Sequence, residues 1–362
     1  MSVTRQINVP NGKVIHAPSV QRHTEIERSA RRPRLGFLGV GWIGRHRLDA
    51  VVKSGLADVV GVADVDSALV TATCAQIPGA AGAEALEDLL HMNLDGLIIA
   101  TPTALHASQT TAVLEAGLAV FCQKPLGRSE AETRQVIEAA RRQDRLLSVD
   151  MSYRFVRGAT KIKNLLDARA IGEVFAADLA FHNAYGPDKR WYYDPLLSGG
   201  GCVIDLGIHL VDMVLWLLDF PRVERVLSRL FAKGKPIGRG EAFLEDYAVA
   251  RLDFESGATA QLSCSWNLPA GRDAVIQIVV YGTAGALALR NVGGSFYDFR
   301  AEQFTGTATT ILDEPPDLWG GRAAVAWAGQ LAQTRQYDPQ VEQALKVAAL
   351  IDAIYGRNSL SN

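Results

Sequence analysis

Three glycines, in the pattern Gly39-x-Gly41-x-x-Gly44, constrain what this chain can fold into more than any other feature. They directly follow an apolar run at residues 34–40, and a helix is predicted to begin near Arg45. Gly39 permits a tight turn, Gly41 lets the backbone approach a ligand, and Gly44 lets a helix pack closely on a strand. Since free N–H groups at a helix N-terminus attract phosphate, the pattern predicts a dinucleotide-binding loop.

An acidic residue at a suitable distance supports that prediction. A second apolar run, residues 59–65, contains Asp64, twenty residues beyond Gly44. A carboxylate there can accept hydrogen bonds from ribose hydroxyls and would repel a 2′-phosphate, to which Asp66 adds. We therefore expect NAD rather than NADP; the alternative is a glycine turn followed by a surface aspartate. The predicted cofactor-binding residues of this segment are Gly39, Gly41, Trp42, Ile43, Gly44 and Asp64.

Residues 34–152 alternate between short apolar runs and helical patterns. The runs are rich in Val, Ile and Leu and lie at 34–40, 59–65, 96–100, 119–122 and 146–149, with helical spacing between them at segments such as 104–116 and 130–142. Parallel strands that are buried on both faces by crossover helices give this rhythm. The sequence predicts an α/β fold in which residues 34–152 form a doubly wound parallel Rossmann sheet.

The pattern changes after that point. Strand-like alternation without crossover helices is found at 174–181, 247–254, 258–266 and 274–281, and helices are predicted at 159–170, 203–218 and 339–355. Such a sequence favours an α+β domain with a large, mainly antiparallel open sheet, over residues 153–356. The closing helix, which begins after Asp338 as a plausible cap, is free to pack back on the Rossmann domain.

The first 33 residues are expected to be an extension. They are rich in Arg, contain three prolines and lack a periodic apolar pattern. A poorly ordered terminus and an arm that reaches a neighbouring subunit both fit this composition. Arg31-Arg32 resembles a twin-arginine export signal, but Arg34 interrupts the following apolar run, which serves better as a first strand.

Composition excludes several classes of protein. The chain has 37 Lys+Arg against 39 Asp+Glu, so no overall positive field attracts nucleic acid or an anionic membrane. Its longest apolar stretch is interrupted by Asp212 and falls short of the ~18 residues of a membrane span. The four cysteines lie far apart, without the spacing of metal ligands. We expect a cytoplasmic protein with reduced cysteines and no metal.

Two further segments follow strands of the predicted Rossmann sheet. Thr101-Pro102, with His106 shortly after, follows the run at 96–100, and Lys124-Pro125 follows the run at 119–122. Ligands of open α/β sheets bind at the carboxyl ends of strands, so both segments should border the cofactor. Lys124 is expected beside the nicotinamide. His106 is either a direct cofactor contact or a polar residue at a helix start.

A third cluster lies in the second half of the chain. Gly199–Gly201 allow the backbone to come close to a ligand, and Asp205 and His209 are spaced to share one face of the next helix. With Lys124 from the other domain, this acid and imidazole make a proton-transfer set for interconverting a hydroxyl and a carbonyl. The alternative is a structural hydrogen-bonded pair. Asp212, one turn beyond, is a candidate either to orient the imidazole or simply to cap a polar contact.

Taken together, Gly39–Gly44, Asp64, Thr101-Pro102, Lys124-Pro125, Gly199–Gly201, Asp205 and His209 resemble the glucose-fructose oxidoreductase / inositol dehydrogenase / rhizopine-catabolism family, Gfo/Idh/MocA. The resemblance covers residues 34–356. It implies NAD(P)-linked redox chemistry on sugars, cyclitols and related polyols, with assembly into homodimers or homotetramers through the C-terminal sheet. It also implies that Lys124, Asp205 and His209 are catalytic and that Trp191 lies near the nicotinamide. The usual Glu-Lys-Pro is Gln123-Lys124-Pro125 here, a departure that removes a possible carboxylate partner of the lysine.

The expected function is therefore an NAD-dependent dehydrogenase acting on a ring hydroxyl or ketone, with His209 as general acid and base. The residues predicted to bind substrate are Lys124, Arg154, Tyr185, Asp205 and His209, since polar and aromatic groups near strand ends suit polyhydroxylated rings. Two alternatives are a redox-neutral lyase or hydrolase that uses NAD transiently and a non-catalytic dinucleotide-binding sensor.

Overall fold

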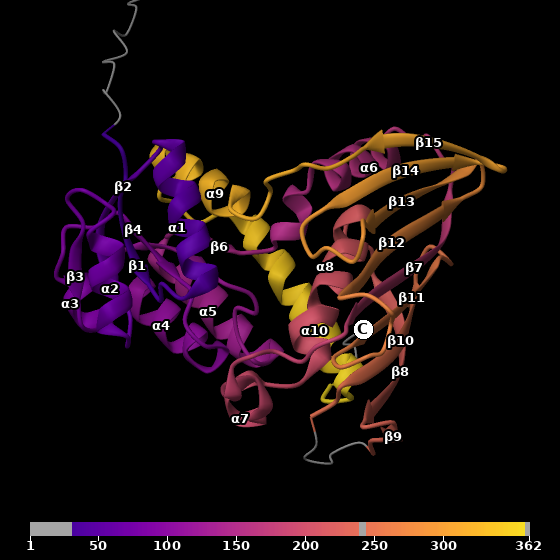
Figure 1. The fold of residues 1–362 in the computed structure, drawn as a ribbon, viewed down its shortest axis with the longest axis horizontal. Helices are drawn as coiled ribbons and strands as arrows, with labels where there is room; N and C mark the ends of the chain where they lie inside the picture. The colour runs from indigo at the N-terminus through magenta and orange to yellow at the C-terminus, as the bar shows by residue number, and fades with distance from the viewer. Residues whose placement is uncertain (1–30, 239–243, 359–362) are drawn as a thin grey trace, which may run out of the picture. The chain divides into compact units, whose positions relative to one another are not determined.

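A computed structural model describes residues 31–238 and 244–358 of the chain (Figure 1). The predicted extension, residues 1–33, lies outside the described residues except for its last three. The described part of the chain holds two sheets.

The first sheet has six parallel strands in the order β3-β2-β1-β4-β5-β6. The strands are β1 (Arg34–Leu38), β2 (Asp58–Ala63), β3 (Ala81–Ala83), β4 (Gly96–Ile99), β5 (Ala119–Cys122) and β6 (Leu147–Val149). The helices between them are α1 (Trp42–Ser54), α2 (Ser67–Cys74), α3 (Leu86–Leu90), α4 (Thr103–Glu115) and α5 (Glu130–Gln143). This confirms the predicted Rossmann sheet. The short β3, Ala-Gly-Ala, contains no β-branched residue and gave no strand signal.

The second sheet has nine strands among the described residues, in the order β15-β14-β13-β12-β7-β11-β10-β8-β9. They are β7 (Val174–Asn183), β8 (Val223–Ala232), β9 (Lys235–Pro236), β10 (Tyr247–Phe254), β11 (Thr259–Ser265), β12 (Ala274–Gly282), β13 (Gly285–Asn291), β14 (Phe299–Thr305) and β15 (Ala308–Asp313). The β7–β11 pair is parallel and the other pairs are antiparallel, as the prediction of a mainly antiparallel open sheet requires.

Helices cover one face of this second sheet, as Figure 1 shows. They include α6 (Arg157–Asp167), α8 (Ile208–Leu217) and α10 (Glu342–Tyr355). The strands alternate accordingly: in β10, Ala248 and Ala250 are buried in the core, whereas Val249 between them is 37% exposed on the other face. The remaining helical segments are η1 (Ser152–Phe155), η2 (Arg190–Tyr193), α7 (Pro195–Ser198), η3 (Val203–Gly207), α9 (Arg322–Gln333) and η4 (Pro339–Val341).

Helix α9 completes the core of the first sheet although it lies near the end of the chain. Trp327 and Leu331 are buried in one cluster with residues of β1 and β5, and the ring of Trp327 lies 5.8 Å from that of Phe121. Gly96 makes room for them, because a Cβ there would come within 2.9 Å of both side chains. The first core is therefore built from both ends of the chain.

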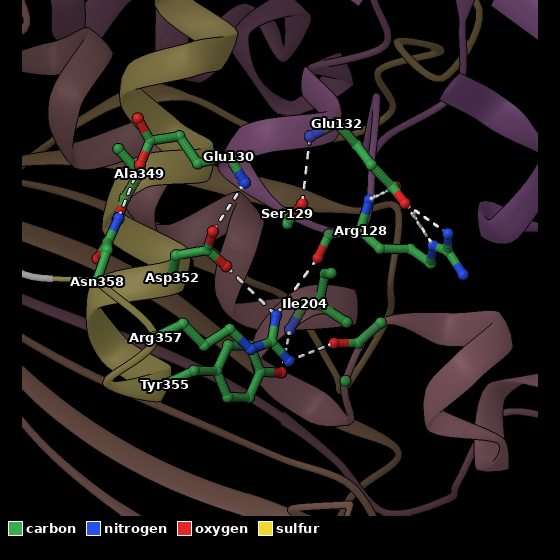
Figure 2. A network of polar contacts seen from close by, with 12 residues as sticks. Arg128, Ser129, Glu130, Glu132, Ile204, Ala349, Asp352, Tyr355, Arg357 and Asn358 are labelled. Carbon is green, nitrogen blue, oxygen red and sulfur yellow. Dashed lines mark hydrogen bonds and ion pairs between the residues drawn. The ribbon is translucent and has the colours of Figure 1, made fainter. Parts of the chain in front are cut away.

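The C-terminal helix α10 is tied to the turn that precedes η3 (Figure 2). The guanidinium of Arg357 donates to the carbonyl oxygen of Gly199 at 2.6 Å and pairs with Asp352. Tyr355 donates its hydroxyl proton to the buried carboxylate of Glu245 at 2.7 Å. That carboxylate also accepts the N–H of Gly201, at 3.0 Å. These contacts fix the start of the helical segment that carries Asp205 and His209.

One helical stretch among the described residues, Pro195–Leu217, is long and apolar enough to cross a membrane, but 89% of its most apolar window is buried inside the protein. Burial of this kind is typical of a core helix. The predicted helix at 203–218 thus exists, with a first part, η3, in π-helical geometry. Such π-helical turns often mark functional sites.

Candidate active site

The glycine loop has the geometry of a phosphate cradle. Gly39 has a φ of +87°, and a Cβ at Gly44 would lie 2.0 Å from the carbonyl oxygen of Gly39, so both positions require glycine for the fold itself. At Gly41, by contrast, a Cβ would meet no atom within 4 Å. The N-terminus of α1 has no side-chain cap, which leaves its N–H groups to receive an anion. These residues fit the pyrophosphate of a dinucleotide.

Asp64 lies at the carboxyl end of β2, next to this loop. Its carboxylate accepts the N–H of Val40 at 2.7 Å and the N–H of Asp66 at 3.0 Å. Asp66 in turn caps α2 through the N–H of Ala68. The carboxylate of Asp64 therefore holds the loop, and its remaining lone pairs can accept hydrogen bonds from ribose hydroxyls.

The ring of His106 lies between two backbone carbonyl groups. Its side chain is buried, with Nδ1 2.6 Å from the carbonyl oxygen of Pro125 and Nε2 2.7 Å from that of Thr101. Both ring nitrogens face backbone carbonyl groups, which favours the reading of His106 as a polar residue at a helix start over a direct cofactor contact. The imidazole links the segments after β4 and β5, while Thr101 and Pro102 keep their place at the start of α4.

Lys124 and Asp205 meet, although 81 residues separate them in the sequence. The ammonium Nζ of Lys124 donates to the carbonyl oxygen of Asp205 at 2.7 Å and to its carboxylate Oδ1 at 3.0 Å. The indole N–H of Trp266 donates to the other carboxylate oxygen at 3.1 Å. Both side chains of the ion pair are mostly buried, which strengthens the interaction. The Lys124–Pro125 peptide bond is cis.

The positive charge of the same lysine acts on His209. Its imidazole is buried, and the ring of Tyr153 packs against it with centroids 4.7 Å apart. Burial and the positive charges of Lys124 and Arg47 hold the pKa of His209 well below its ordinary value of 6.5. Within the described residues, neither ring nitrogen makes a hydrogen bond. A neutral imidazole with free nitrogens can take up a proton from a substrate.

Several other predicted residues are placed elsewhere. Arg154 pairs with the carboxylate of Asp212 and donates to Gln343 at 2.6 Å, so its donors are used inside the protein. These contacts give Arg154 a structural role beside its predicted one as a substrate ligand. Of the two readings of Asp212 they favour a polar contact over orienting His209, because the buried carboxylate needs a cationic partner. Tyr185 donates its hydroxyl proton to Asp273 at 2.6 Å and is 57% exposed.

Trp191 stacks on Tyr192, with ring centroids 3.8 Å apart in η2. Tyr192 lies close enough to Asp205 for the carboxylate to help raise the pKa of the phenol, although burial contributes most to that rise. Tyr192 also meets Trp266 edge to face. The stack thus borders the Lys124–Asp205 pair through Tyr192.

No cluster of three or more His, Cys, Asp or Glu side chains that could hold a metal ion occurs between residues 31 and 358, leaving aside 239–243.

Comparison with known families decides the assignment. Residues 33–151 match an oxidoreductase family with an NAD-binding Rossmann fold, and residues 159–288 match the GFO/IDH/MocA C-terminal domain. Together the two matches cover more than half of the chain. The chain belongs to the GFO/IDH/MocA family. Its relatives in this family are oxidoreductases, among them inositol and glucoside dehydrogenases, and the protein is accordingly an oxidoreductase acting on CH–OH groups.

Among these relatives is "Inositol 2-dehydrogenase 3" of Saccharopolyspora erythraea, 28% identical over 356 residues that cover 90% of this chain and 99% of the relative. The structure of the present chain is similar to that of a levoglucosan dehydrogenase complexed with NADH and levoglucosan. The TM-score is 0.78 at 19% identity, and the match covers 90% of this chain and 97% of that one. A 3-ketoreductase from Actinomadura kijaniata complexed with NADP and TDP-benzene gives a TM-score of 0.77 at 20% identity, covering 90% and 98%.

Sequence reasoning missed three side chains of the site. Trp266, which holds Asp205, lies at the end of a strand 61 residues further on. Arg47 lies on α1 and Asp150 at the end of β6, and they form a buried ion pair at 2.7 Å. The one available signal was position: each of these residues lies at or near the end of a strand or in the first two turns of the helix after the glycine loop.

Proposed function

We propose that this protein is an NAD-dependent dehydrogenase that transfers hydride between a ring hydroxyl or ketone of a sugar, cyclitol or related polyol and the nicotinamide. One observation carries the proposal: the ammonium of Lys124, fixed 3.0 Å from the carboxylate of Asp205, acts electrostatically on a neutral His209 whose ring nitrogens make no hydrogen bond within the described chain. Acid–base groups of this kind are typically worth ~10²–10⁴ in rate.

Lys124, Asp205 and His209 have different roles in the proposed reaction. A ring nitrogen of His209 accepts the proton of the substrate hydroxyl during oxidation and returns it during reduction. The ammonium of Lys124 donates a hydrogen bond to the reacting oxygen and stabilises the negative charge that develops on it. Asp205, held by Lys124 and Trp266, orients the ammonium and offers an acceptor to a neighbouring hydroxyl. When bound, the nicotinamide supplies the two-electron hydride acceptor.

NAD is favoured over NADP in this proposal. The loop of Gly39, Gly41, Trp42, Ile43 and Gly44 would hold the pyrophosphate, with Thr101 and Pro102 beside it. Asp64 and Asp66 place two carboxylates at the end of β2, where a 2′-phosphate would be repelled. Structural neighbours bind either cofactor, so the preference rests on these two residues.

A polyhydroxylated ring suits the surroundings of His209. Tyr153, Trp319 and Tyr297 form a continuous set of rings beside it, with Tyr153 and Trp319 centroids 5.0 Å apart and Trp319 and Tyr297 centroids 6.2 Å apart. Aromatic faces pack well against the C–H groups of sugars and cyclitols. Relatives named as an inositol 2-dehydrogenase and a levoglucosan dehydrogenase support the same substrate class.

The decisive experiment incubates the purified protein with NAD and a panel of cyclitols, sugars and sugar acids while NADH absorbance is followed. Net NADH formation with one of them is expected, and His209→Ala should lower turnover by at least ~100-fold with NADH affinity unchanged. Consumption of a sugar without net NADH would favour a redox-neutral lyase or hydrolase. Binding of NADH without conversion of any compound would favour a sensor.

We also propose a homodimer or homotetramer formed through the second sheet, in the cytoplasm. The sheet face opposite the helices carries exposed apolar residues, Val249 and Leu227 among them, which a second copy can cover. Cys74, Cys122, Cys202 and Cys264 are all free thiols, as expected in a reducing compartment. Light scattering after gel filtration gives the mass in solution, and a monomer that persists at high concentration would contradict the assembly.

A further inference from the structure

A buried chain of polar contacts joins α1 to the backbone of Lys124. The Nε of Arg47 donates to Oδ2 of Asp150 at 2.7 Å, and the side-chain amide of Gln123 donates to the same oxygen at 3.0 Å. The amide oxygen of Gln123 then accepts the N–H of Lys124 at 2.9 Å. Asp150 is completely buried, and the side chain of Arg47 is only 8% exposed.

Both contacts of Gln123 require an amide, because its NH₂ group donates to Asp150 and its oxygen accepts the N–H of Lys124. A glutamate at this position would bring two carboxylates about 3 Å apart away from water, and one of them would have to take up a proton. The identities of residues 123 and 150 therefore depend on each other. The departure from Glu-Lys-Pro in the sequence is matched by a carboxylate that arrives from the end of β6 instead.

Stability alone does not account for Asp150. A buried ion pair is weak evidence for stabilisation, since desolvation offsets much of the Coulomb attraction. Moreover, Oδ1 of Asp150 is buried and has no hydrogen-bond partner in the described part of the chain, which costs free energy. A carboxylate kept in this state at the ligand-binding edge of the sheet calls for a role in the site itself.

The segment that Gln123 holds is the one that places the lysine. On its far side, the carbonyl oxygen of Pro125 is fixed by the buried ring of His106. Between these two anchors, the side chain of Lys124 extends to Asp205. Arg47, the cationic partner of Asp150, also contributes its charge at His209. The network thus touches both the lysine and the surroundings of the imidazole.

We propose that Asp150 is a positioning residue: by orienting the amide of Gln123 it fixes the backbone at Lys124, and so sets the ammonium against Asp205, while it holds the guanidinium of Arg47 beside the site. The kinetic part of this inference rests on the proposed dehydrogenase function. The structural part is that one of residues 123 and 150 must be a carboxylate and the other an amide, and it does not depend on the dehydrogenase function.

Three variants test it: Gln123→Glu, Asp150→Asn and the double variant Gln123→Glu/Asp150→Asn, which moves the carboxylate from one position to the other. The control is Asp95→Asn. Asp95 is also buried and paired with an arginine, Arg335. It precedes β4 and so lies at the amino ends of the strands, away from the carboxyl ends at which ligands bind. The readouts are the thermal unfolding midpoint of each variant, crystal structures that show the Nζ of Lys124, and kcat as a function of pH.

Each single variant is expected to lower kcat by roughly 10- to 100-fold, because a small misplacement of a catalytic group costs that much. The double variant should recover at least about tenfold over the worse single one and should unfold at a higher temperature than additivity predicts. In Asp150→Asn the acidic limb of kcat should move to lower pH, since the charge of Arg47 is then uncompensated. Asp95→Asn should lower the unfolding midpoint and leave kcat and its pH profile unchanged.

The inference is overturned if the double variant is no better than the worse single one in both unfolding and position of Lys124, or if Asp150→Asn and Asp95→Asn behave alike in kcat and pH profile. If the wild type oxidises no compound of the panel, the dehydrogenase proposal fails. The unfolding midpoints of the two single variants and the double variant, together with the crystal structures, still decide whether Asp150 and Gln123 together place the lysine.

Discussion

The imidazole of His209 packs against the phenol ring of Tyr153, with centroids 4.7 Å apart and planes inclined by 52°. Tyr153 belongs to η1, which leads out of the first sheet, and His209 lies in α8, which covers the second. Their contact buries the imidazole at the place where the two halves of the fold meet. Burial disfavours the charged form, so His209 is neutral at neutral pH.

A pH profile tests this electrostatic arrangement. Because the pKa of His209 is held well below 6.5, the acidic limb of kcat/KM for oxidation should lie well below that pH in the wild type. Lys124→Met removes a positive charge that lowers this pKa, so the limb should move to higher pH even as the rate falls. Lys161→Met removes the same charge from a pair with Asp313 outside the site and should leave the limb in place. An acidic limb in Lys124→Met at or below the wild-type pH would contradict the effect of the Lys124 charge on the pKa of His209.

Two glycines of the same loop should behave differently. Gly41→Ala meets no atom within 4 Å, so its unfolding midpoint should equal that of the wild type, whereas its affinity for NADH should fall by at least about tenfold because the new methyl group meets the pyrophosphate. Gly44→Ala places a Cβ 2.0 Å from the carbonyl oxygen of Gly39, so it should lose stability as well, by roughly 1–3 kcal/mol. Thermal unfolding with and without NADH measures both. Full NADH affinity in Gly41→Ala would argue against the cradle.

Cofactor choice should respond to the charge of Asp64. Asn at this position still accepts the N–H of Val40 but no longer repels a 2′-phosphate, so the ratio of kcat/KM for NADP to that for NAD should rise by roughly tenfold or more. Asp66→Asn retains the cap of α2 and should raise the same ratio by less, because Asp66 only adds to the charge of Asp64. An unchanged ratio in Asp64→Asn would show that another group selects the cofactor.

The C-terminal anchor of the catalytic segment can be measured separately. Tyr355→Phe keeps the ring under the guanidinium of Arg357, 4.1 Å from its centroid, but removes the hydroxyl that donates to the buried Glu245. The free energy of unfolding should fall by about 1–3 kcal/mol, as expected for a buried charged acceptor left short of a donor. Tyr337→Phe loses a similar bond to the partly exposed Glu342 and should cost clearly less. Equal losses in a denaturant titration would contradict this difference.

Local patterns carried much of the fold and of the candidate site. The glycine loop, the parallel strands, the place of Lys124 after a predicted strand and the spacing of Asp205 and His209 each depend on residues close together in the sequence. The order of strands, the location of α9 against β5 and the pairing of Lys124 with Asp205 depend on contacts between distant residues, for which one sequence holds no signal.

The departures from expectation have the same physical origin. Arg154 follows the first sheet directly and is polar, as a substrate ligand would be, yet the buried carboxylate of Asp212, 58 residues later, binds it. His106 sits at a helix start, but two carbonyl groups that the folded chain brings together occupy both of its ring nitrogens. In each case a buried polar group of the protein binds a side chain for which a ligand contact had been considered.

The packing of α9 bears on any attempt to reuse the nucleotide-binding half of this enzyme. A fragment that ends with the sixth strand of the first sheet would lack Trp327 and Leu331, which pack at Gly96. The apolar side chains of the first core that they cover would then be exposed to water. A chimera or a transplanted cofactor module would therefore have to bring along a helix encoded some 170 residues downstream of that strand.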